Sequence, residues 1–321
     1  MTRFILRRLA IIPVALLLVH LAGFAYAHFA GPLRAARMPY VFVQLDSPPF
    51  FPTYRDYLQG AVRLDFGTMP GATESIVVAM SRAATNSLGL LALVMIFSVP
   101  IGLFLGLRSV RSDPPAVSQW LTLTSTLGLA MPSFYIGSLF VVASISYVRF
   151  KGPGTEIPFP IQGFGWDRHM VLPALALMVR PTVQIARVTS GLLADELGKQ
   201  YTLAARSLGH SWRAIRWRLA LSNILAPIIL TITGSLRLLV SELILIEWLF
   251  RWPGLGRLLS WTLVPAQLTT SAGSPLFLNP PVVAAVLTSI AALFLTTDFI
   301  AAALARVLDP RLRAPEEVGN G

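Results

Sequence analysis

The chain contains no cysteine among its 321 residues. This absence excludes disulfide bonds, thiolate metal sites and a cysteine nucleophile. Charged residues are scarce as well, because Asp, Glu, Lys and Arg make up only 13% of the sequence, against about a quarter in typical soluble domains. Hydrophobic residues make up 55%. Together the two fractions indicate a protein whose solvent is largely lipid.

The sequence also lacks the common motifs of nucleotide binding and catalysis. No G-x-x-x-x-G-K-[ST] loop is present, so the chain does not bind ATP phosphates in the P-loop manner. His20, His28, His169 and His210 show no H-E-x-x-H spacing, and no G-x-S-x-G elbow occurs. We therefore expect no catalytic residue and no metal. The net charge of +11 does not indicate nucleic-acid binding, because the basic residues flank apolar spans and cover no soluble domain.

Six apolar segments are long enough to cross a bilayer, which takes about 20 helical residues. The first follows three arginines, but it is longer than the apolar region of a signal peptide and no cleavage site follows it, so we expect a retained helix. The predicted fold class is an all-α membrane protein with six transmembrane helices. The segments are Leu9–Phe29, Asn86–Leu107, Trp120–Val148, Val171–Val188, Ile224–Phe250 and Val282–Leu304.

The loops between these spans differ in their basic residues. Lys and Arg are concentrated in the short loops on the side of the N-terminus, which predicts a multi-pass protein of the cell membrane with both termini in the cytoplasm. The predicted organisation is the first helix with its leading residues (1–29), an extracytoplasmic segment forming a small cap (30–85), a membrane core of five helices (86–309) with a cytoplasmic loop (189–223), and a cytoplasmic tail (310–321).

The cytoplasmic loop 189–223 interrupts the apolar runs with a pattern typical of a helix. Small and apolar residues recur at three- and four-residue steps, and Gly209 then marks the helix end with a left-handed cap. Arg213, Arg216 and Arg218 are expected to line the start of the next helix near the lipid headgroups. Two interpretations stay open: an amphipathic helix on the membrane surface with a basic rim, and a short helix offered to a soluble partner. The residues of the stripe are Tyr201, Ala204, Ala205, Leu208 and Trp212.

The spacing Ala204-Ala205-x-x-x-Gly209 resembles the cytoplasmic loop signature of ABC importer permeases. A version without the usual Glu, Y-x-x-x-A-[RK]-x-x-G, is typical of the dipeptide, oligopeptide and nickel permeases of the subunit-B type, and Tyr201, Ala205, Arg206 and Gly209 fit it. Further segments resemble this branch in the family's order along most of the chain. They are Asp65-Phe66-Gly67 in the outer segment, Pro132-Ser133-Phe134 in "MPSFYIG", "VLPALAL" and "ARVTSGLL" around the fourth span, Glu247, Pro253, Gly254 and Gly256 in "EWLFRWPGLGRLL", and Asp309-Pro310 in "LDPRLR".

The resemblance implies a type I ABC importer permease fold, in which this chain forms half of a translocation pathway for peptides or a related small solute. A coupling helix, Tyr201–Gly209, is implied to dock in a groove of an ATPase subunit. The implied partners are a second, homologous permease in a heterodimer, two ATPase subunits that bind the ATP, and an extracytoplasmic substrate-binding protein; no cofactor is implied for this chain. The residues implied in ATPase coupling are Tyr201, Ala204, Ala205, Arg206, Leu208 and Gly209.

A rival from another class is a membrane-embedded enzyme acting on a lipid or prenyl-phosphate substrate, with Arg and Glu side chains handling the phosphate. Co-purification with an ATPase would favour the importer, whereas activity of the isolated chain would favour the enzyme. A third alternative, a self-sufficient ion-coupled carrier, lacks any sign of paired inverted repeats in the sequence.

Ionisable residues inside the spans are costly in hydrocarbon and usually face a bundle interior or a water-filled path. Glu247 matches the family pattern before the outer Pro-Gly turn and is expected to be structural. Arg180, Arg237 and Glu242 stand where the family has small or neutral residues, and with Asp298 they are candidates for the translocation path. Interhelical ion pairs and a substrate-selecting lining both stay open. Because Arg237 and Glu242 are about 140° apart around a helix, we expect any partner of either to lie on another helix.

Overall fold

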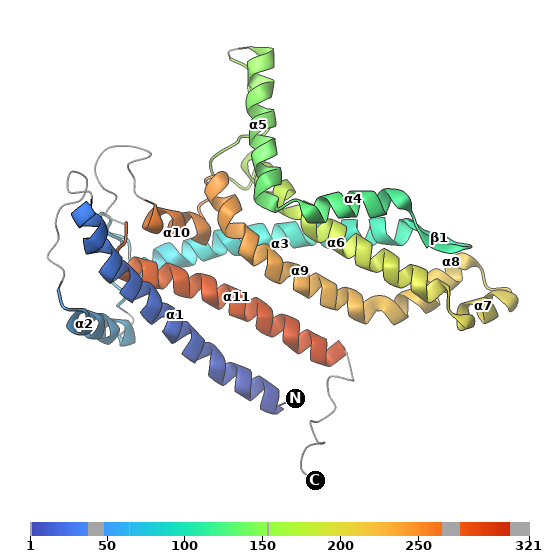
Figure 1. Cartoon of the computed structure of the whole chain (residues 1–321), viewed down its shortest axis with the longest axis horizontal. Coiled ribbons are helices and arrows are strands. Elements are labelled where there is room, and N and C mark those ends of the chain that lie inside the picture. The colour runs from blue at the N-terminus through green and yellow to red at the C-terminus, as the bar shows by residue number, and fades with distance from the viewer. Residues whose placement is uncertain (1, 38–47, 64, 153, 265–276, 309–321) are drawn as a thin grey trace, which may run out of the picture.

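The computed structural model describes residues 2–37, 48–63, 65–152, 154–264 and 277–308. Within these ranges the chain is mostly helical, with a short antiparallel β-hairpin (Figure 1). A π-helical segment, η2, joins α8 to α9. The elements are α1 (Thr2–Arg37), α2 (Phe50–Val62), α3 (Ile76–Arg108), β1 (Val110–Ser112), β2 (Pro115–Val117), α4 (Gln119–Ala130), α5 (Ser133–Lys151), η1 (Arg168–Met170), α6 (Val171–Leu197), α7 (Gln200–Ser207), α8 (Trp212–Ala214), η2 (Ile215–Ala220), α9 (Leu221–Leu249), α10 (Leu255–Leu263) and α11 (Pro280–Leu308).

Six helical stretches of the described residues are long and apolar enough to cross a membrane. Five of them, which include α1, α3, α6, α9 and α11, correspond to five of the predicted spans. The prediction of an all-α protein with six membrane helices is therefore confirmed. Many of their apolar side chains are exposed on the chain surface, as expected for helices that face lipid or another membrane subunit.

The third predicted span, Trp120–Val148, is wrong as a single helix, because it is divided between α4 and α5. Pro132 has no N–H to donate, and it places Met131 in an extended conformation with φ −94° and ψ 119°. Apolar residues continue across the break, so a count of apolar residues does not detect it. α5 then leaves the bundle at a steep angle (Figure 1), and its buried residues all lie between Ser133 and Gly137.

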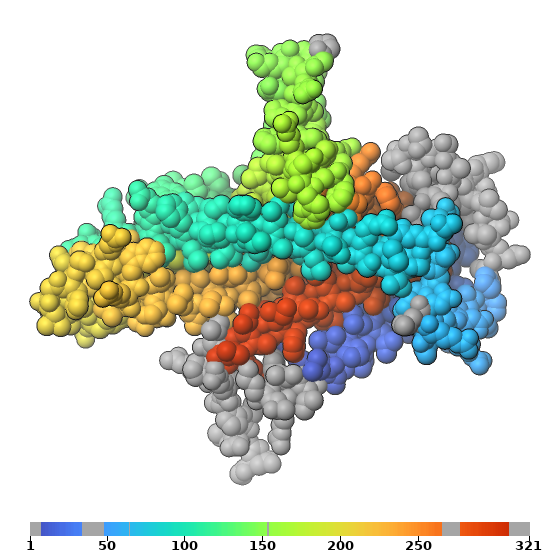
Figure 2. Space-filling model, turned by 180° about the vertical axis from the view of Figure 1, so that it is seen from behind, coloured from blue at the N-terminus to red at the C-terminus, as the bar shows by residue number. Residues whose placement is uncertain are grey.

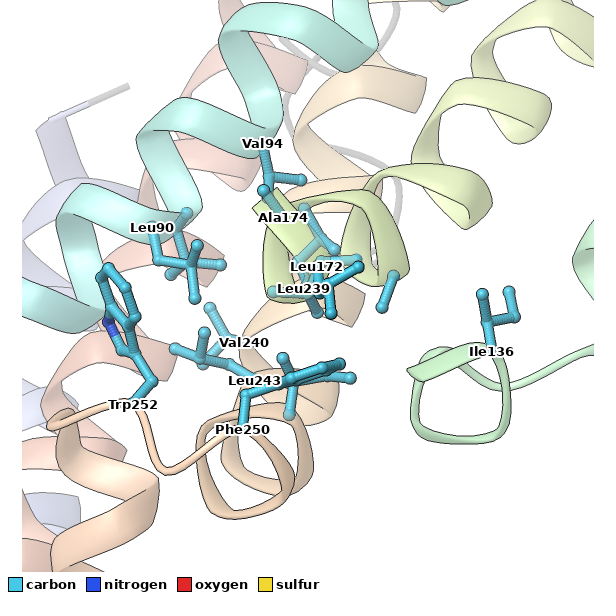
Figure 3. Close-up of a cluster of buried hydrophobic side chains, with 14 residues drawn as sticks. Leu90, Val94, Ile136, Leu172, Ala174, Leu239, Val240, Leu243, Phe250 and Trp252 are labelled. Atoms are coloured by element: carbon cyan, nitrogen blue, oxygen red, sulfur yellow. The ribbon is translucent and has the colours of Figure 1, made fainter. Parts of the chain in front are cut away.

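The core of the bundle lies between α3, α6 and α9 (Figure 3). α3 approaches α6 closely, since a β-carbon at Gly102 would lie 2.8 Å from the backbone oxygen of Thr182. Small residues allow such close packing in lipid, where no hydrophobic effect drives helices together. Residues of the core cluster drawn in Figure 3 include Leu90, Val94, Ile136, Leu172, Ala174, Leu239, Val240, Leu243, Phe250 and Trp252.

α1 packs along α11 and also contacts α2 (Figure 1). The contact between α1 and α2 is aromatic: the ring centroid of Phe24 lies 5.0 Å from that of Tyr54 and 5.3 Å from that of Tyr57. Seen from behind, the α7–α8 segment (gold) occupies one end of the molecule and α2 (blue) lies at the opposite end (Figure 2). The elements α7 and α2 are therefore far apart, which is compatible with the predicted placement on opposite sides of a membrane.

Candidate functional site

The loop between α6 and α9 is folded around the short helix α7, which is anchored through one face. Thr202 is fully buried, and its hydroxyl donates a hydrogen bond of 2.7 Å to the carbonyl of Leu197 at the end of α6. Ala205 is also buried and belongs to the same apolar cluster as Ile215. This face fixes α7 against the helical segments that follow it.

The opposite face of α7 is exposed, with Leu208 retaining 80% of its accessible surface and Leu203 59%. The predicted stripe is therefore wrong in part: Ala204 and Leu208 are exposed, Ala205 is buried, and Trp212 lies beyond the end of α7, in α8. The stripe pattern failed because the buried face of this short helix is formed by a hydroxyl and a methyl group. What remains is a small, apolar surface available to another molecule.

Gly209 ends α7 in a left-handed conformation, with φ +87°, as the sequence predicts. Its N–H donates to the Arg206 carbonyl at 3.0 Å, and the N–H of His210 donates to the Ala205 carbonyl at 3.1 Å, which together form a Schellman motif. The Arg206 guanidinium donates to the His210 carbonyl at 3.1 Å and lies 5.6 Å from the ring centroid of Trp212. The turn after α7 is thus fixed by two backbone hydrogen bonds and by the Arg206 side chain.

Glu196, at the end of α6, joins three helices and was missed by sequence reasoning. The residue is 5% exposed, and its carboxylate accepts hydrogen bonds from the Tyr201 hydroxyl at 2.6 Å, from the Asn223 side-chain amide at 2.9 Å and from the Lys199 ammonium. Burial, and then the hydrogen bond to Glu196, raise the pKa of Tyr201 to about 12, so this phenol stays a donor at neutral pH. The Glu196–Lys199 spacing was visible in the sequence, but the approach of Asn223 depends on the fold.

Arg216 turns inward, which corrects the expectation that it lines the headgroup region with its neighbours. Its guanidinium donates to the carbonyls of Leu107 at 3.0 Å and Val110 at 2.7 Å, and to the Ser112 hydroxyl at 2.9 Å. These acceptors lie at the end of α3 and in β1, where the last helical carbonyls need donors. The start of the α8–α9 helix is therefore clamped to the end of α3.

The first intramembrane ion pair joins α6 to α9. Arg180 is paired with Glu242, and the Ser133 hydroxyl at the start of α5 donates to the same carboxylate. The Nε atom of Arg180 is buried and has no hydrogen-bond partner within the described part of the chain. Three helices therefore meet at one carboxylate, next to the break that Pro132 produces.

The second pair joins α9 to α11 and α1. Arg237 lies 3.0 Å from one oxygen of Asp298, and Arg8 lies 2.7 Å from the other. The expectation that Arg237 and Glu242 find partners on other helices is confirmed by both pairs. The four path candidates thus form two separate ion-paired clusters, on different sides of α9. A substrate-lining role for them stays a prediction.

Glu247 is fully buried at the end of α9, where it holds the turn into α10. Its carboxylate accepts from the Ser87 hydroxyl on α3 at 2.6 Å and from the backbone N–H of Gly256 at 2.6 Å, while the N–H of Leu255 donates to the Ser87 oxygen at 3.0 Å. A β-carbon at Gly254 would overlap the Glu247 carboxylate. The Glu, the glycines and the serine therefore form one packed unit, which agrees with a structural role for this motif.

The remaining family-motif residues lie in turns and at helix starts. Asp65 accepts from the backbone N–H of Gly67 at 3.0 Å, and Gly67 has φ +81°, so this turn needs both residue types. Phe66 packs beside the apolar cluster that contains Ile76. The carbonyl of Pro253 accepts from the Asn86 side-chain amide at 2.9 Å.

In the Pro132-Ser133-Phe134 segment, Pro132 precedes α5 as its N-cap, and Phe134 is exposed on the first turn of α5. Asp309 and Pro310 lie outside the described residues.

Known proteins resemble this chain over most of its length. Residues 98–314, more than half of the chain, match the family described as "binding-protein-dependent transport system inner membrane component". The chain belongs to this family. Its members are permease subunits of ABC importers, which work with an ATPase and a substrate-binding protein, and this sets aside the lipid-enzyme alternative.

Curated relatives cover most of the chain. The oligopeptide transport system permease protein AppB of Bacillus subtilis is 26% identical over 268 residues, covering 82% of this chain and 81% of that protein. The dipeptide transport system permease protein DppB of Lactococcus lactis is 27% identical, covering 83% and 81%. The protein of that name in Escherichia coli is 27% identical, covering 98% and 99%. This permease is thus a multi-pass membrane protein and not itself an enzyme.

Proposed function

We propose that this permease transports peptides or a related small solute and couples to its ATPase through the exposed face of α7. The substrate class follows the names of the relatives, which are oligopeptide and dipeptide permeases. The observation that carries the coupling is the one-sided burial of α7: Thr202 and Ala205 face inward, whereas Leu203, Ala204 and Leu208 are exposed. The α7–α8 segment itself lies at one end of the molecule (Figure 2). A fixed helix with a free apolar face is suited to a groove on a partner.

Cysteine crosslinking tests the docking directly, because the native chain has no cysteine. Ala204→Cys and Leu208→Cys, paired with cysteines in the groove of the co-expressed ATPase, should crosslink. Ala205→Cys on the buried face is the matched control and should not. Absence of a crosslink at both exposed positions in every nucleotide state would contradict the docking. Uptake of labelled dipeptides by proteoliposomes that contain the whole transporter tests the substrate separately.

The proposed arrangement places both termini and the α7 loop in the cytoplasm, and the α2 cap outside. Support comes from the arginine-rich short loops and from the position of α2 and α7 at opposite ends of the molecule. An impermeant thiol reagent added to intact cells should label Gln59→Cys and leave His210→Cys unlabelled. The reverse pattern would overturn this orientation.

The second permease of the proposed heterodimer is expected to cover α5. This helix leaves the bundle, and Leu139, Val142, Ile145 and Phe150 are exposed along it. The ion-paired clusters around Glu242 and Asp298 are proposed to lie along the pathway between the two permeases, because charged groups in apolar helices are rarely exposed to lipid. Assembly of the isolated chain into a stable monomer with full dipeptide transport would contradict this arrangement.

A further inference from the structure

The helix that follows α7 has its orientation fixed by Arg216. Because this side chain is bound to the carbonyls of Leu107 and Val110 and to Ser112, the helix cannot rotate about its axis without breaking three hydrogen bonds. Ile215 is fully buried beside it. The side chains on the opposite side of this helix are therefore held away from the bundle.

That outward side carries a hollow of about 500 Å³ lined by Ser211, Arg213, Ala214, Trp217 and Arg218. Arg213 and Arg218 are five residues apart, which on an α-helix places two side chains about 140° apart. Here a wider, π-helical turn from Ile215 to Ala220 separates them, and both arginines line the same hollow. π-Helical turns of this kind are rare and occur frequently at functional sites. Neither arginine is in an ion pair with any residue that the structure describes.

We propose that this hollow binds the headgroup phosphate of an anionic phospholipid. Two guanidinium groups provide several donors for phosphate oxygens, and Trp217, 54% exposed, provides the amphipathic ring that is enriched at membrane interfaces. Exposed apolar residues continue from Trp217 through Leu219 to Leu225, within the helical stretch Trp212–Leu249 that is long and apolar enough to cross a membrane. The hollow therefore lies at the N-terminal end of this apolar stretch, where lipid headgroups are expected.

The same geometry favours a lipid over an acidic protein segment. The hollow is formed on the helix that enters the membrane, whereas the exposed face proposed to dock the ATPase belongs to α7, before the Gly209 turn. A lipid bound here would attach the start of α9 to the bilayer surface while α7 stays free to move with its partner. The inference does not depend on the identity of the transported substrate.

The test is retention of phosphatidylglycerol or phosphatidylcholine by the assembled transporter, measured by native mass spectrometry after mild delipidation. The wild type should retain phosphatidylglycerol preferentially, and Arg213→Gln with Arg218→Gln should lower that retention by about ten- to thirtyfold, since each basic residue near an anionic surface contributes about 1 kcal/mol. Arg111→Gln, an exposed arginine of β1 outside the hollow, is the matched control and should not change it. Excess inorganic phosphate that displaces the lipid completely would show a free-phosphate site and overturn the proposal.

If the double variant does not assemble, the wild type still decides. Brominated phosphatidylglycerol should quench tryptophan fluorescence more than brominated phosphatidylcholine does, and the difference should disappear in Trp217→Phe. Equal retention and equal quenching by the two lipids would overturn the proposal. So would loss of ATPase co-purification in the double variant with unchanged phosphatidylglycerol retention, because the surface would then be a protein contact.

Discussion

Removal of the Glu196 carboxylate should loosen the loop around α7 without unfolding the bundle. In Glu196→Ala, the Tyr201 hydroxyl and the Asn223 amide both lose an acceptor that is almost fully buried. A hydrogen bond to a charged group contributes about 1.5–3 kcal/mol. The two donors keep a contact of 3.2 Å with each other, so we expect a net cost of about 2–4 kcal/mol, with nothing added for the exposed Lys199.

The matched substitution is Glu196→Gln, because Tyr201 and Asn223 both donate to the same oxygen, Oε1. A glutamine oxygen at that position keeps both bonds, so the expected cost is about 1 kcal/mol or less. Without the carboxylate charge, the pKa of Tyr201 should fall from about 12. The stability that a raised phenol pKa contributes is fully present below pH 10 and is lost as the pH rises towards 12, so this tyrosine should cause no pH dependence of stability around neutral pH.

Hydrogen exchange of the assembled transporter measures the loosening. Backbone amides of 198–212 should exchange at least about thirtyfold faster in Glu196→Ala, since 2 kcal/mol corresponds to that factor, and near the wild-type rate in Glu196→Gln. Glu74→Ala removes a half-buried carboxylate that is paired with the exposed Arg82, far from this loop in the sequence, and should leave the loop unchanged. Transport per hydrolysed ATP should fall in the alanine variant alone. Equal exchange in Glu196→Ala and the wild type, or equal damage by Ala and Gln, would refute the reasoning.

Three further predictions follow from single positions. A β-carbon has open space at both Gly209 and Gly191, so the two positions differ in backbone conformation and not in crowding. Gly209→Ala, at φ +87°, should cost about 1–2 kcal/mol and uncouple transport, whereas Gly191→Ala within α6 should be neutral or stabilising. Equal transport by the two variants would contradict the requirement for a left-handed residue at position 209. Gly254→Ala should lower the free energy of unfolding by about 2–4 kcal/mol because its β-carbon displaces the buried Glu247 carboxylate. Gly234→Ala, in an open part of α9, should not lower it. Equal melting temperatures of the two variants would contradict the packing of the turn after α9. Arg237→Met should fold well because Asp298 keeps its ion pair with Arg8, whereas Asp298→Leu removes the carboxylate partner of Arg237 within the span at a cost of about 2.5–3.5 kcal/mol. If Arg237→Met folds and keeps normal ATPase activity but loses transport, Arg237 has a role in the path; if Arg237→Met transports at the wild-type rate, that role is excluded.

The sequence by itself determined the features that depend on short stretches of chain. Five of the six spans follow from long, predominantly apolar stretches, because a bilayer requires a fixed length of apolar helix wherever that helix lies. The left-handed end of α7 follows from Gly209, since glycine adopts that conformation without steric cost. Family membership follows from motifs whose order along the chain is itself part of the sequence.

Tertiary structure decided every feature that joins distant segments. Helical spacing showed that Arg237 and Glu242 point apart, but only the packing of α6 and α11 against α9 selected Arg180 and Asp298 as their partners. The sequence does not distinguish Arg213, Arg216 and Arg218 from one another. In the fold, Arg216 turns inward because the last carbonyls of α3 need donors, and its guanidinium reaches them. Glu196 becomes the centre of the loop only when α9 brings Asn223 to it. Side-chain partners across helices depend on rotation and depth in the bundle, and local sequence specifies neither.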